Sequence, residues 1–275
     1  MRQKISDRNV FPKFDIEKEY EKLDDLYSRN LAMGYGDSGV ASLTFAECFD
    51  RYFLDWPLRG SYTSDDELRK VLHITDSDFL HGVSEDILLD YIQYVYNAID
   101  FVCQLRDEGI FECDHSIKAA IRSNCELIMR YLDAEMQLVN GEYFVVYKDD
   151  VATAVAEQNQ DIKASITEYL KIDNRGDINR KAEVLCTLAK KLEENKDAYK
   201  GNEFSKLYTD TTTLLNTSGI RHAQSERQAI DKNFKDMDSN ELEKWYNRTF
   251  QMVLACLAVL PYIGFKNEIE SLKKV

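Results

Sequence analysis

The sequence is poor in residues that break helices and in residues that carry positive charge. Only 3 of its 275 residues are proline and 11 are glycine. This argues against a sandwich of short strands joined by tight turns and favours long helices. Lys and Arg number 35 against 49 Asp and Glu, which gives a net charge of −14. The shortage of cations argues against extended nonspecific contact with nucleic acid and against docking on an anionic membrane surface, but it leaves room for a local cationic site.

Long apolar runs and paired cysteines are also lacking. The longest apolar run, MVLACLAVL from Met252 to Leu260, is far shorter than the roughly 20 residues that a membrane-spanning helix needs. No apolar stretch follows a basic start at the N-terminus, so we expect no signal peptide. The 6 cysteines are scattered without any CxxC spacing, which indicates reduced thiols in a cytoplasmic protein.

The common motifs for nucleotide binding, hydrolysis and metal binding are absent. GYGDSG at residues 34–39 lacks the Lys-Ser/Thr of a phosphate-binding loop, and no GxSxG elbow or kinase motif set occurs. One region gathers zinc-ligand types without a zinc spacing, namely Cys103, Cys113, Asp114, His115 and Cys125. His73 and His81 lie near carboxylates, again without a spacing typical of a metal. We therefore expect no metal and no cofactor.

The apolar pattern predicts a mainly α protein. Residues at helical spacing predict helices over residues 15–33, 44–54, 64–72, 84–105, 115–138, 151–170, 178–192, 204–215 and 239–263. Ser64, Ser84 and Ser239 are predicted N-caps, and Glu67 is expected to complete a capping box with Ser64. Pro261 is expected to end or kink the last helix.

One stretch interrupts the helical pattern near the middle of the chain. NGEYFVVYKDD, from Asn140 to Asp150, joins an Asn-Gly turn to a β-branched and aromatic run. This composition predicts a short strand or a hairpin near residues 141–148. We place a domain boundary here, which gives a helical domain over residues 1–138 and a second helical domain over residues 139–275.

The segment LNTSGIRHAQSERQAI, from Leu215 to Ile230, puts Arg221 and His222 side by side after a glycine. Arg offers a planar fork of donors that suits a phosphate, and His can move a proton near neutral pH. Together they supply what RNA cleavage requires. We predict that both are catalytic and that four neighbours contribute to binding, namely Asn216, Ser218, Glu226 and Arg227. The alternative is an ordinary helix start with solvated side chains.

Four segments resemble abortive-infection proteins with an AbiJ-type N-terminal domain. ISDRNVF at Ile5–Phe11 resembles the opening of that domain, and RYFLDWPL at Arg51–Leu58 resembles its early aromatic helix. NGEYFVVYKDD resembles the strand before the C-terminal helical part, and TSGIRHA at Thr217–Ala223 resembles the Gly-Ile-Arg-His segment within that part. GIRHA is the most specific of these matches.

The resemblance implies a bacterial phage-defence protein whose C-terminal half is a HEPN-like helical bundle. Proteins of that class often form homodimers and often cleave RNA without a metal. Their catalytic pattern is an Arg, a polar residue and a His several positions on. Arg221 and His222 match the first two positions, but no second His follows, because the sequence continues as Ser225, Glu226, Arg227 and Gln228.

Two other functions stay open at the level of sequence. The chain can be a binding or sensing module that recognises a regulatory protein, a nucleotide or RNA without cleaving it, and the missing second His favours this class. It can also be a structural helical protein without a site. The RNase hypothesis predicts RNA as substrate and a homodimer with a shared cleft, and all three predict no membrane contact.

Overall fold

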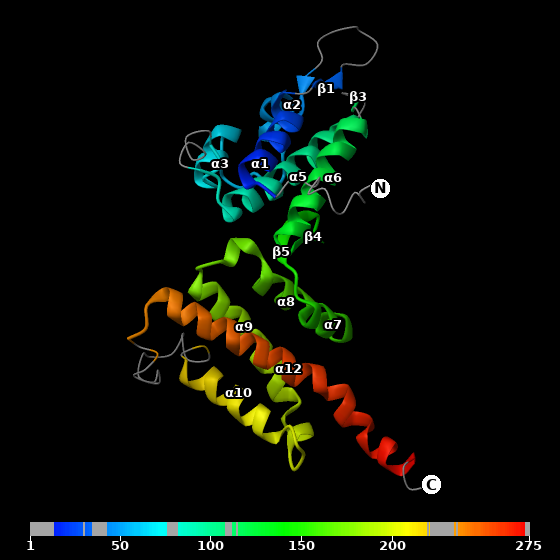
Figure 1. Cartoon of the computed structure of the whole chain (residues 1–275), viewed down its shortest axis with the longest axis vertical. Coiled ribbons are helices and arrows are strands. Elements are labelled where there is room, and N and C mark those ends of the chain that lie inside the picture. Colours follow the sequence, from blue (N-terminus) through cyan, green and yellow to red (C-terminus); the bar gives the residue numbers. More distant parts are fainter. Residues whose placement is uncertain are drawn as a thin grey trace, which may run out of the picture. The chain divides into compact units, whose positions relative to one another are not determined.

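The computed structural model is mainly helical, which confirms the prediction of a mainly α protein (Figure 1). The described residues are 14–29, 31–34, 43–75, 82–107, 112–113, 115–218, 220, 234 and 236–272. The chain divides into two compact units, Met1–Tyr147 and Lys148–Val275, which we call unit 1 and unit 2. The predicted boundary after residue 138 falls inside a strand of unit 1, because the residues on either side of it belong to one hairpin.

Unit 1 combines helices with two small antiparallel sheets. Its elements are α1 (Ile16–Asp24), the π-helix η2 (Asp25–Arg29), β1 (Leu31–Gly34), β2 (Leu43–Thr44), α2 (Phe45–Tyr52), the 3-10 helix η3 (Phe53–Asp55), α3 (Asp65–Val71), α5 (Glu85–Asp107), β3 (Glu112–Cys113), α6 (His115–Tyr131), β4 (Ala134–Val139) and β5 (Glu142–Tyr147). Strands β2, β1 and β3 form one sheet in that order, and β4 pairs with β5. Helices α5 and α6 lie side by side (Figure 1).

The predicted hairpin exists, and it begins earlier than the sequence indicates. β4 pairs with β5 in register from Ala134 opposite Tyr147 to Val139 opposite Glu142. The turn residues Asn140 and Gly141 both have positive φ, 55° and 87°, which is the conformation that Asn-Gly favours in a two-residue hairpin. Pairing with β5 therefore removes residues 134–138 from the predicted helix, and α6 ends at Tyr131.

The three-stranded sheet was not predicted. The helix predicted over residues 15–33 includes residues 31–33, but α1 ends at Asp24, and the chain continues as η2 and then as β1. Met33 of β1 pairs with Leu43 on one side and with Cys113 on the other. These partners are distant in the sequence, so a local pattern does not reveal them.

Aromatic side chains fill the interior of unit 1. Phe49 of α2 is fully buried. Its ring centroid lies 5.7 Å from that of Phe53, 5.1 Å from Trp56, 5.7 Å from Tyr94 and 6.1 Å from Phe101, each in an edge-to-face arrangement. Such pairs are favourable beyond the area that they bury. This cluster joins α2 and η3 to the long helix α5.

Helix starts in unit 1 follow the predicted chemistry with one difference. Thr44 and Glu47 form a complete capping box at the start of α2. At α3, the Ser64 hydroxyl accepts from the amide of Glu67, as predicted. The Glu67 carboxylate, however, accepts from the amide and hydroxyl of Thr63 at 2.8 and 2.9 Å, so the reciprocal bond is made one residue earlier than in a capping box.

Unit 2 is a bundle of helices. Its elements are α7 (Asp150–Gln158), α8 (Lys163–Leu170), the 3-10 helix η4 (Ile172–Asn174), α9 (Ile178–Glu194), the 3-10 helix η5 (Lys196–Tyr199), α10 (Ser205–Thr217) and α12 (Ser239–Leu272). The predicted helix over 151–170 is interrupted at Asn159–Ile162. Leu185, Leu188 and Leu192 of α9 pack with Leu254 and Leu257 of α12 in one buried cluster.

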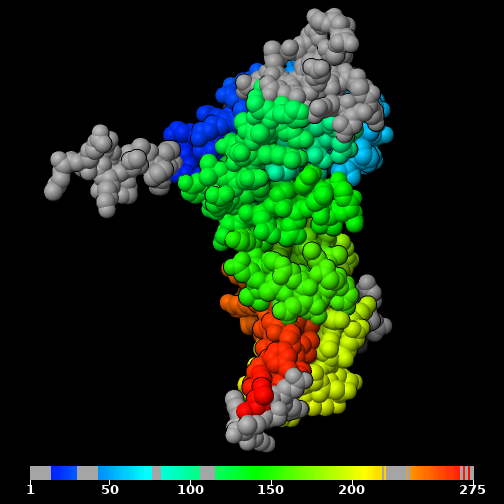
Figure 2. Space-filling view, turned by 90° about the vertical axis from the view of Figure 1, so that its right-hand side faces the viewer, coloured from blue at the N-terminus to red at the C-terminus, as the bar shows by residue number. Residues whose placement is uncertain are grey.

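The last helix is longer than predicted and has a different cap. Asp238, not Ser239, caps it, because the Asp238 carboxylate accepts from the amide of Glu241 at 2.8 Å. Pro261 lies inside α12, which continues to Leu272 instead of ending near residue 263. The C-terminal part of α12 is at the surface beside α10 (Figure 2). Tyr262 and Phe265 in this part of the helix are exposed.

By length and composition alone, the Ser239–Lys266 part of α12 could cross a membrane, although no single apolar run in it is long enough. In unit 2 this part of the helix packs against α9, α10 and α7. Val253, Leu254 and Leu257 are fully buried there. A helix at the centre of a bundle has the same composition.

Candidate functional site

The predicted catalytic segment follows α10 in unit 2. Arg221, His222, Glu226 and Arg227 lie outside the described residues. Asn216 is exposed in the last turn of α10, and Ser218 is buried at the C-cap of that helix. The structure therefore locates two of the four predicted binding residues, one on the surface and one in the interior.

The start of this segment is attached to the bundle. The Ser218 hydroxyl donates to the carbonyl of Leu214 at 2.6 Å, and the Tyr246 hydroxyl donates to the carbonyl of Ser218 at 3.3 Å. Ile220 is buried, with 2% of its surface exposed. Ser218 thus holds the chain at the end of α10, and Arg221 directly follows a residue that is packed in the core.

A polar cluster joins α8, α9 and α12 near the start of α12. Lys181 Nζ lies 2.5 Å from Glu243 Oε1 and donates to Asn247 Oδ1 at 3.1 Å. The Tyr169 hydroxyl donates to the same Asn247 oxygen at 3.0 Å, and the amide of Gly176 donates to Glu243 Oε1 at 3.0 Å. We call Tyr169, Lys181, Glu243 and Asn247 the α9–α12 polar cluster. It was not predicted, because its members lie far apart in the sequence.

The α9–α12 polar cluster keeps its carboxylate charged. Burial acts to raise the pKa of Glu243, but the hydrogen bonds from Lys181 and Gly176 and the charge of Lys181 outweigh it and lower that pKa. A carboxylate held in its charged form by a cation is a poor proton donor. The cluster therefore ties the helices together and does not have the properties of a general acid.

A second polar cluster lies inside unit 1. The Tyr94 hydroxyl donates to Asp65 Oδ1 at 2.7 Å, and the Tyr27 hydroxyl donates to that of Tyr94 at 3.4 Å. Arg69 lies over the Tyr94 ring at 6.0 Å. Burial raises the pKa of Asp65 despite the opposing effects of Tyr94 and Arg69. Burial likewise raises the pKa values of Tyr27 and Tyr94.

The unit 1 cluster also lacked a sequence signal. Asp65 belongs to TSDDEL, an acidic run of the kind that usually forms a solvated face. Of the three acids in this run, only Asp65 is buried, with 7% of its surface exposed, whereas Asp66 and Glu67 are exposed. Tyr94 lies within the helix predicted over residues 84–105, but a helical pattern does not show which acid a tyrosine contacts.

The described residues offer little for a metal. No group of three or more His, Cys, Asp or Glu side chains in the described part of the chain is arranged to hold an ion. None of five cysteines in the described part of the chain forms a disulfide bond, namely Cys48, Cys103, Cys125, Cys186 and Cys256. Burial raises the pKa of Cys48 to about 12 and raises that of Cys125 still further, so neither is a ready thiolate ligand.

Comparison with known proteins adds no assignment. No protein-family model, no curated protein and no solved structure matches the chain.

Proposed function

We propose that the chain is a bacterial abortive-infection protein and that unit 2 is a HEPN-like domain that cleaves RNA without a metal. The Gly-Ile-Arg-His segment carries this proposal, together with the burial of Ile220 within it. It follows the last helical residues of α10, and the buried side chain of Ile220 precedes Arg221 directly. A catalytic side chain needs such a fixed support to hold its geometry.

The proposed reaction uses two groups. The 2′-oxygen of a ribose attacks the adjacent phosphorus, a P–O bond forms, and the bond to the 5′-oxygen breaks. Arg221 binds the phosphate and stabilises the negative charge of the transition state. His222 removes the 2′-hydroxyl proton in one protomer, and His222 of the other protomer of a dimer protonates the leaving oxygen. A two-fold interface supplies both histidines at one cleft.

The test is RNA cleavage by the purified full chain in the presence of a chelator. We expect cleavage of total cellular RNA that is lost in Arg221→Ala and in His222→Ala. Arg130→Ala and His115→Ala are the matched controls, because both residues are exposed on α6 of unit 1, and they should cleave normally. Cleavage that persists in either unit 2 variant, or that stops with the chelator, would overturn the proposed mechanism.

A second candidate function is RNA or protein recognition without cleavage. The observation that favours it is the absence of a second His after Arg221, where Ser225, Glu226, Arg227 and Gln228 stand. In this case Arg221 binds an anionic group and His222 has no chemical role. RNA binding by the intact chain without cleavage, weakened by Arg221→Ala and unaffected by His222→Ala, would select this candidate over the RNase.

The RNase candidate requires a homodimer, and both candidates place the protein in the cytoplasm. Light scattering after size-exclusion chromatography distinguishes a monomer of 31.9 kDa from a dimer. A monomer at working concentration would remove the shared cleft from the proposed mechanism.

A further inference from the structure

The two strands of the β4–β5 hairpin differ in what their outer edges meet. Along each strand, every second residue turns its backbone N–H and C=O away from the other strand. In β5, Tyr143 and Val145 do so, and side chains of α5 meet them. Asn97 accepts from the amide of Tyr143 at 2.9 Å and donates to its carbonyl at 2.8 Å. Gln93 accepts from the amide of Val145 at 2.8 Å. The outer edge of β5 is therefore paired with α5.

The outer edge of β4 has no such partner. Met136 lies opposite Val145 and Leu138 lies opposite Tyr143, so Met136 and Leu138 also turn their backbone groups outward. No residue in the described part of the chain forms a hydrogen bond with the backbone amide or carbonyl of either one. The Leu138 residue is 60% exposed. A row of unpaired N–H and C=O groups is a template for another strand.

β4 also lacks the features that usually protect an edge strand. Its sequence, AEMQLV, contains no proline and no lysine. Its register with β5 runs without a bulge from one end of the strand to the other. Proteins commonly use prolines, lysines and bulges to keep an edge from pairing. The edge of β4 is therefore open to a partner strand.

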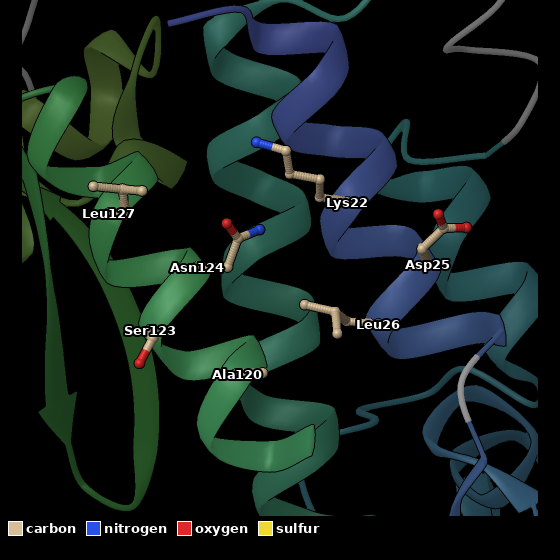
Figure 3. Close-up of a pocket in the computed structure, with 7 residues that line it drawn as sticks. All are labelled: Lys22, Asp25, Leu26, Ala120, Ser123, Asn124 and Leu127. Carbon is tan, nitrogen blue, oxygen red and sulfur yellow. The ribbon is translucent and has the colours of Figure 1, made fainter. Parts of the chain in front are cut away.

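The β4 edge is distinct from the pocket of unit 1 that Figure 3 shows. That pocket lies between α1–η2 and α6, and the residues that line it all belong to these elements. An occupant that fits within those walls would leave Met136 and Leu138 unpaired. The edge therefore needs a partner of its own.

The sequence of β4 suits pairing with a second copy of itself. Two β4 strands related by a two-fold axis are antiparallel, and the same residues contribute from both sides. With the axis at Gln137, Met136 of one chain lies opposite Leu138 of the partner subunit. The two residues then exchange N–H···O=C bonds, and the axis repeats the exchange. All the outward backbone groups of Met136 and Leu138 are paired in this way.

The side chains fit the same register. Met136 and Leu138 of the partner subunit form an apolar cross-strand pair, which covers the exposed leucine. Gln137 faces Gln137 of the partner subunit, and an amide side chain both donates and accepts hydrogen bonds. Glu135 lies opposite Val139 of the partner subunit, so no like charges meet.

Neighbouring registers fit less well. With the axis at Met136, the pairing would draw on Ala134, which is buried. With the axis at Glu135, two glutamates would lie directly opposite each other, and like charges in that position are destabilising. The axis at Gln137 is therefore the favoured one.

We propose that the β4 edge of unit 1 binds β4 of a second copy of this chain, with the two-fold axis at Gln137. The two hairpins then form one antiparallel sheet in the order β5–β4–β4–β5. Backbone hydrogen bonds hold the two strands together, and the alternating side chains set the register.

The first experiment is disulfide crosslinking of the full chain carrying Gln137→Cys. In the proposed register the two new thiols occupy a pair whose Cα atoms are about 4.5 Å apart, a separation that a disulfide spans. We expect a disulfide-linked dimer on a non-reducing gel after mild oxidation.

The controls for crosslinking are Glu135→Cys and the unmodified chain. Residue 135 lies on the same face of β4, but the proposed register places it opposite Val139 of the partner subunit, far from its own copy. Neither control should form the dimer in comparable yield. Absence of the dimer in Gln137→Cys, or equal crosslinking of Gln137→Cys and Glu135→Cys, would overturn the proposal.

The second experiment exchanges charge at the axis. Gln137→Lys and Gln137→Glu each place two like charges opposite one another, so each should raise the dimer dissociation constant at least about tenfold. An equal mixture of the two variants should restore the dimer, because lysine then faces glutamate. Light scattering measures the mass against the monomer of 31.9 kDa, and melting temperatures check that each variant is folded. A dimer that withstands both substitutions, or a mixture that stays monomeric, would contradict the proposed axis.

The inference does not rest on the proposed RNase. Arg221→Ala combined with Gln137→Cys should crosslink as Gln137→Cys alone does. A dimer that neither crosslinks at residue 137 nor responds to charge there belongs to another interface, such as the proposed cleft of unit 2. That result would overturn the β4 interface and leave the RNase proposal standing.

Discussion

The two units bury tyrosines and carboxylates in different ways. In unit 1, Tyr94 donates to the carboxylate of Asp65, whose pKa is raised by burial. In unit 2, Tyr199 donates to the carbonyl of Cys256 at 2.8 Å. A partly buried carboxylate of unit 2, that of Glu243, instead contacts a lysine, and its pKa is lowered.

In both acids burial acts to raise the pKa, and the two differ in how far their partners oppose that effect. A tyrosine hydroxyl donates a hydrogen bond but brings no positive charge, so desolvation dominates at Asp65. Lys181 brings a full charge, so desolvation is outweighed at Glu243. The chain has 2 tryptophans, Trp56 in unit 1 and Trp245 in unit 2, and each can report on its own unit.

The largest effect is expected from the aromatic interior of unit 1. Phe49→Ala should lower the free energy of unfolding of unit 1 by about 4 kcal/mol, because it removes a fully buried ring with four aromatic neighbours. Urea unfolding followed by Trp56 fluorescence, in a Trp245→Phe background, measures this change.

The matched control for Phe49→Ala is Leu54→Ala, since Leu54 is 63% exposed. This substitution should change the free energy of unfolding by less than about 0.5 kcal/mol. Trp245, observed in a Trp56→Phe background, should report an unchanged transition. If both tryptophans shift together, the two units unfold as one and the comparison between them fails.

The next largest effect is expected from the α9–α12 polar cluster. Lys181→Met leaves Glu243 charged without its cation and should destabilise unit 2 by about 3 kcal/mol. Urea unfolding followed by Trp245 fluorescence measures this destabilisation. The double variant Lys181→Met, Glu243→Leu should recover much of the loss, since both charges are then gone. A double variant as unstable as Lys181→Met alone would show that packing, and not the ion pair, explains the loss.

The pH dependence should have opposite signs in the two units. Because the folded pKa of Glu243 is below its ordinary 4.5, its stabilisation is full above that value and is lost as pH falls through the lowered folded pKa. Because the folded pKa of Asp65 is above its ordinary 3.8, its contribution is full below that value and is lost as pH rises through the raised folded pKa.

At pH 7, Glu243→Gln should therefore destabilise unit 2 by about 2 kcal/mol, and Asp65→Asn should stabilise unit 1. The amide oxygen of Asn can still accept from Tyr94. Thermal unfolding between pH 3 and pH 8 checks both. A loss of stability in Asp65→Asn at pH 7 would mean that the Asp65 charge is favourable after all.

The smallest effects are expected at helix caps, and they should be equal in both units. Thr44→Ala at α2 and Asp177→Ala at α9 should each cost about 1 kcal/mol, because each removes a side-chain acceptor for a first-turn amide. Thr209→Ala is the control, since this exposed residue lies inside α10 and alanine is the better helix former. If Thr209→Ala lowers the free energy of unfolding as much as the two cap variants do, the effect at the caps does not come from the lost cap hydrogen bond.

Elements with purely local signals could be predicted. The Asn-Gly turn marked the hairpin, and Ser64 marked the start of α3, because a turn or a cap depends on neighbouring residues. The end of α6 could not be predicted, because residues 134–138 fit a helix locally and become a strand only by pairing with β5. The cap of α12 was placed one residue too late, at Ser239 instead of Asp238, since both residue types cap well.

The candidate site also has one part that the sequence reveals and another part that only the fold reveals. Arg221 and His222 are visible as a pair of chemical groups in one short segment. The burial of Ser218 and its bond from Tyr246 depend on a helix that begins after residue 238. The α9–α12 polar cluster joins Lys181 to Glu243 across 62 positions, which no spacing rule connects.

By itself, the sequence determined the mainly helical class, most helix starts, the Asn-Gly turn and the acidic charge, because propensity, capping and composition act over a few residues. Tertiary structure alone decided that residues 31–34 and 134–139 are strands, that Asp65 is buried while Asp66 is exposed, and that Glu243 meets Lys181. The physical reason is that strand pairing, ion pairing and burial join residues far apart in the chain, and their free energy exists only once the chain is folded.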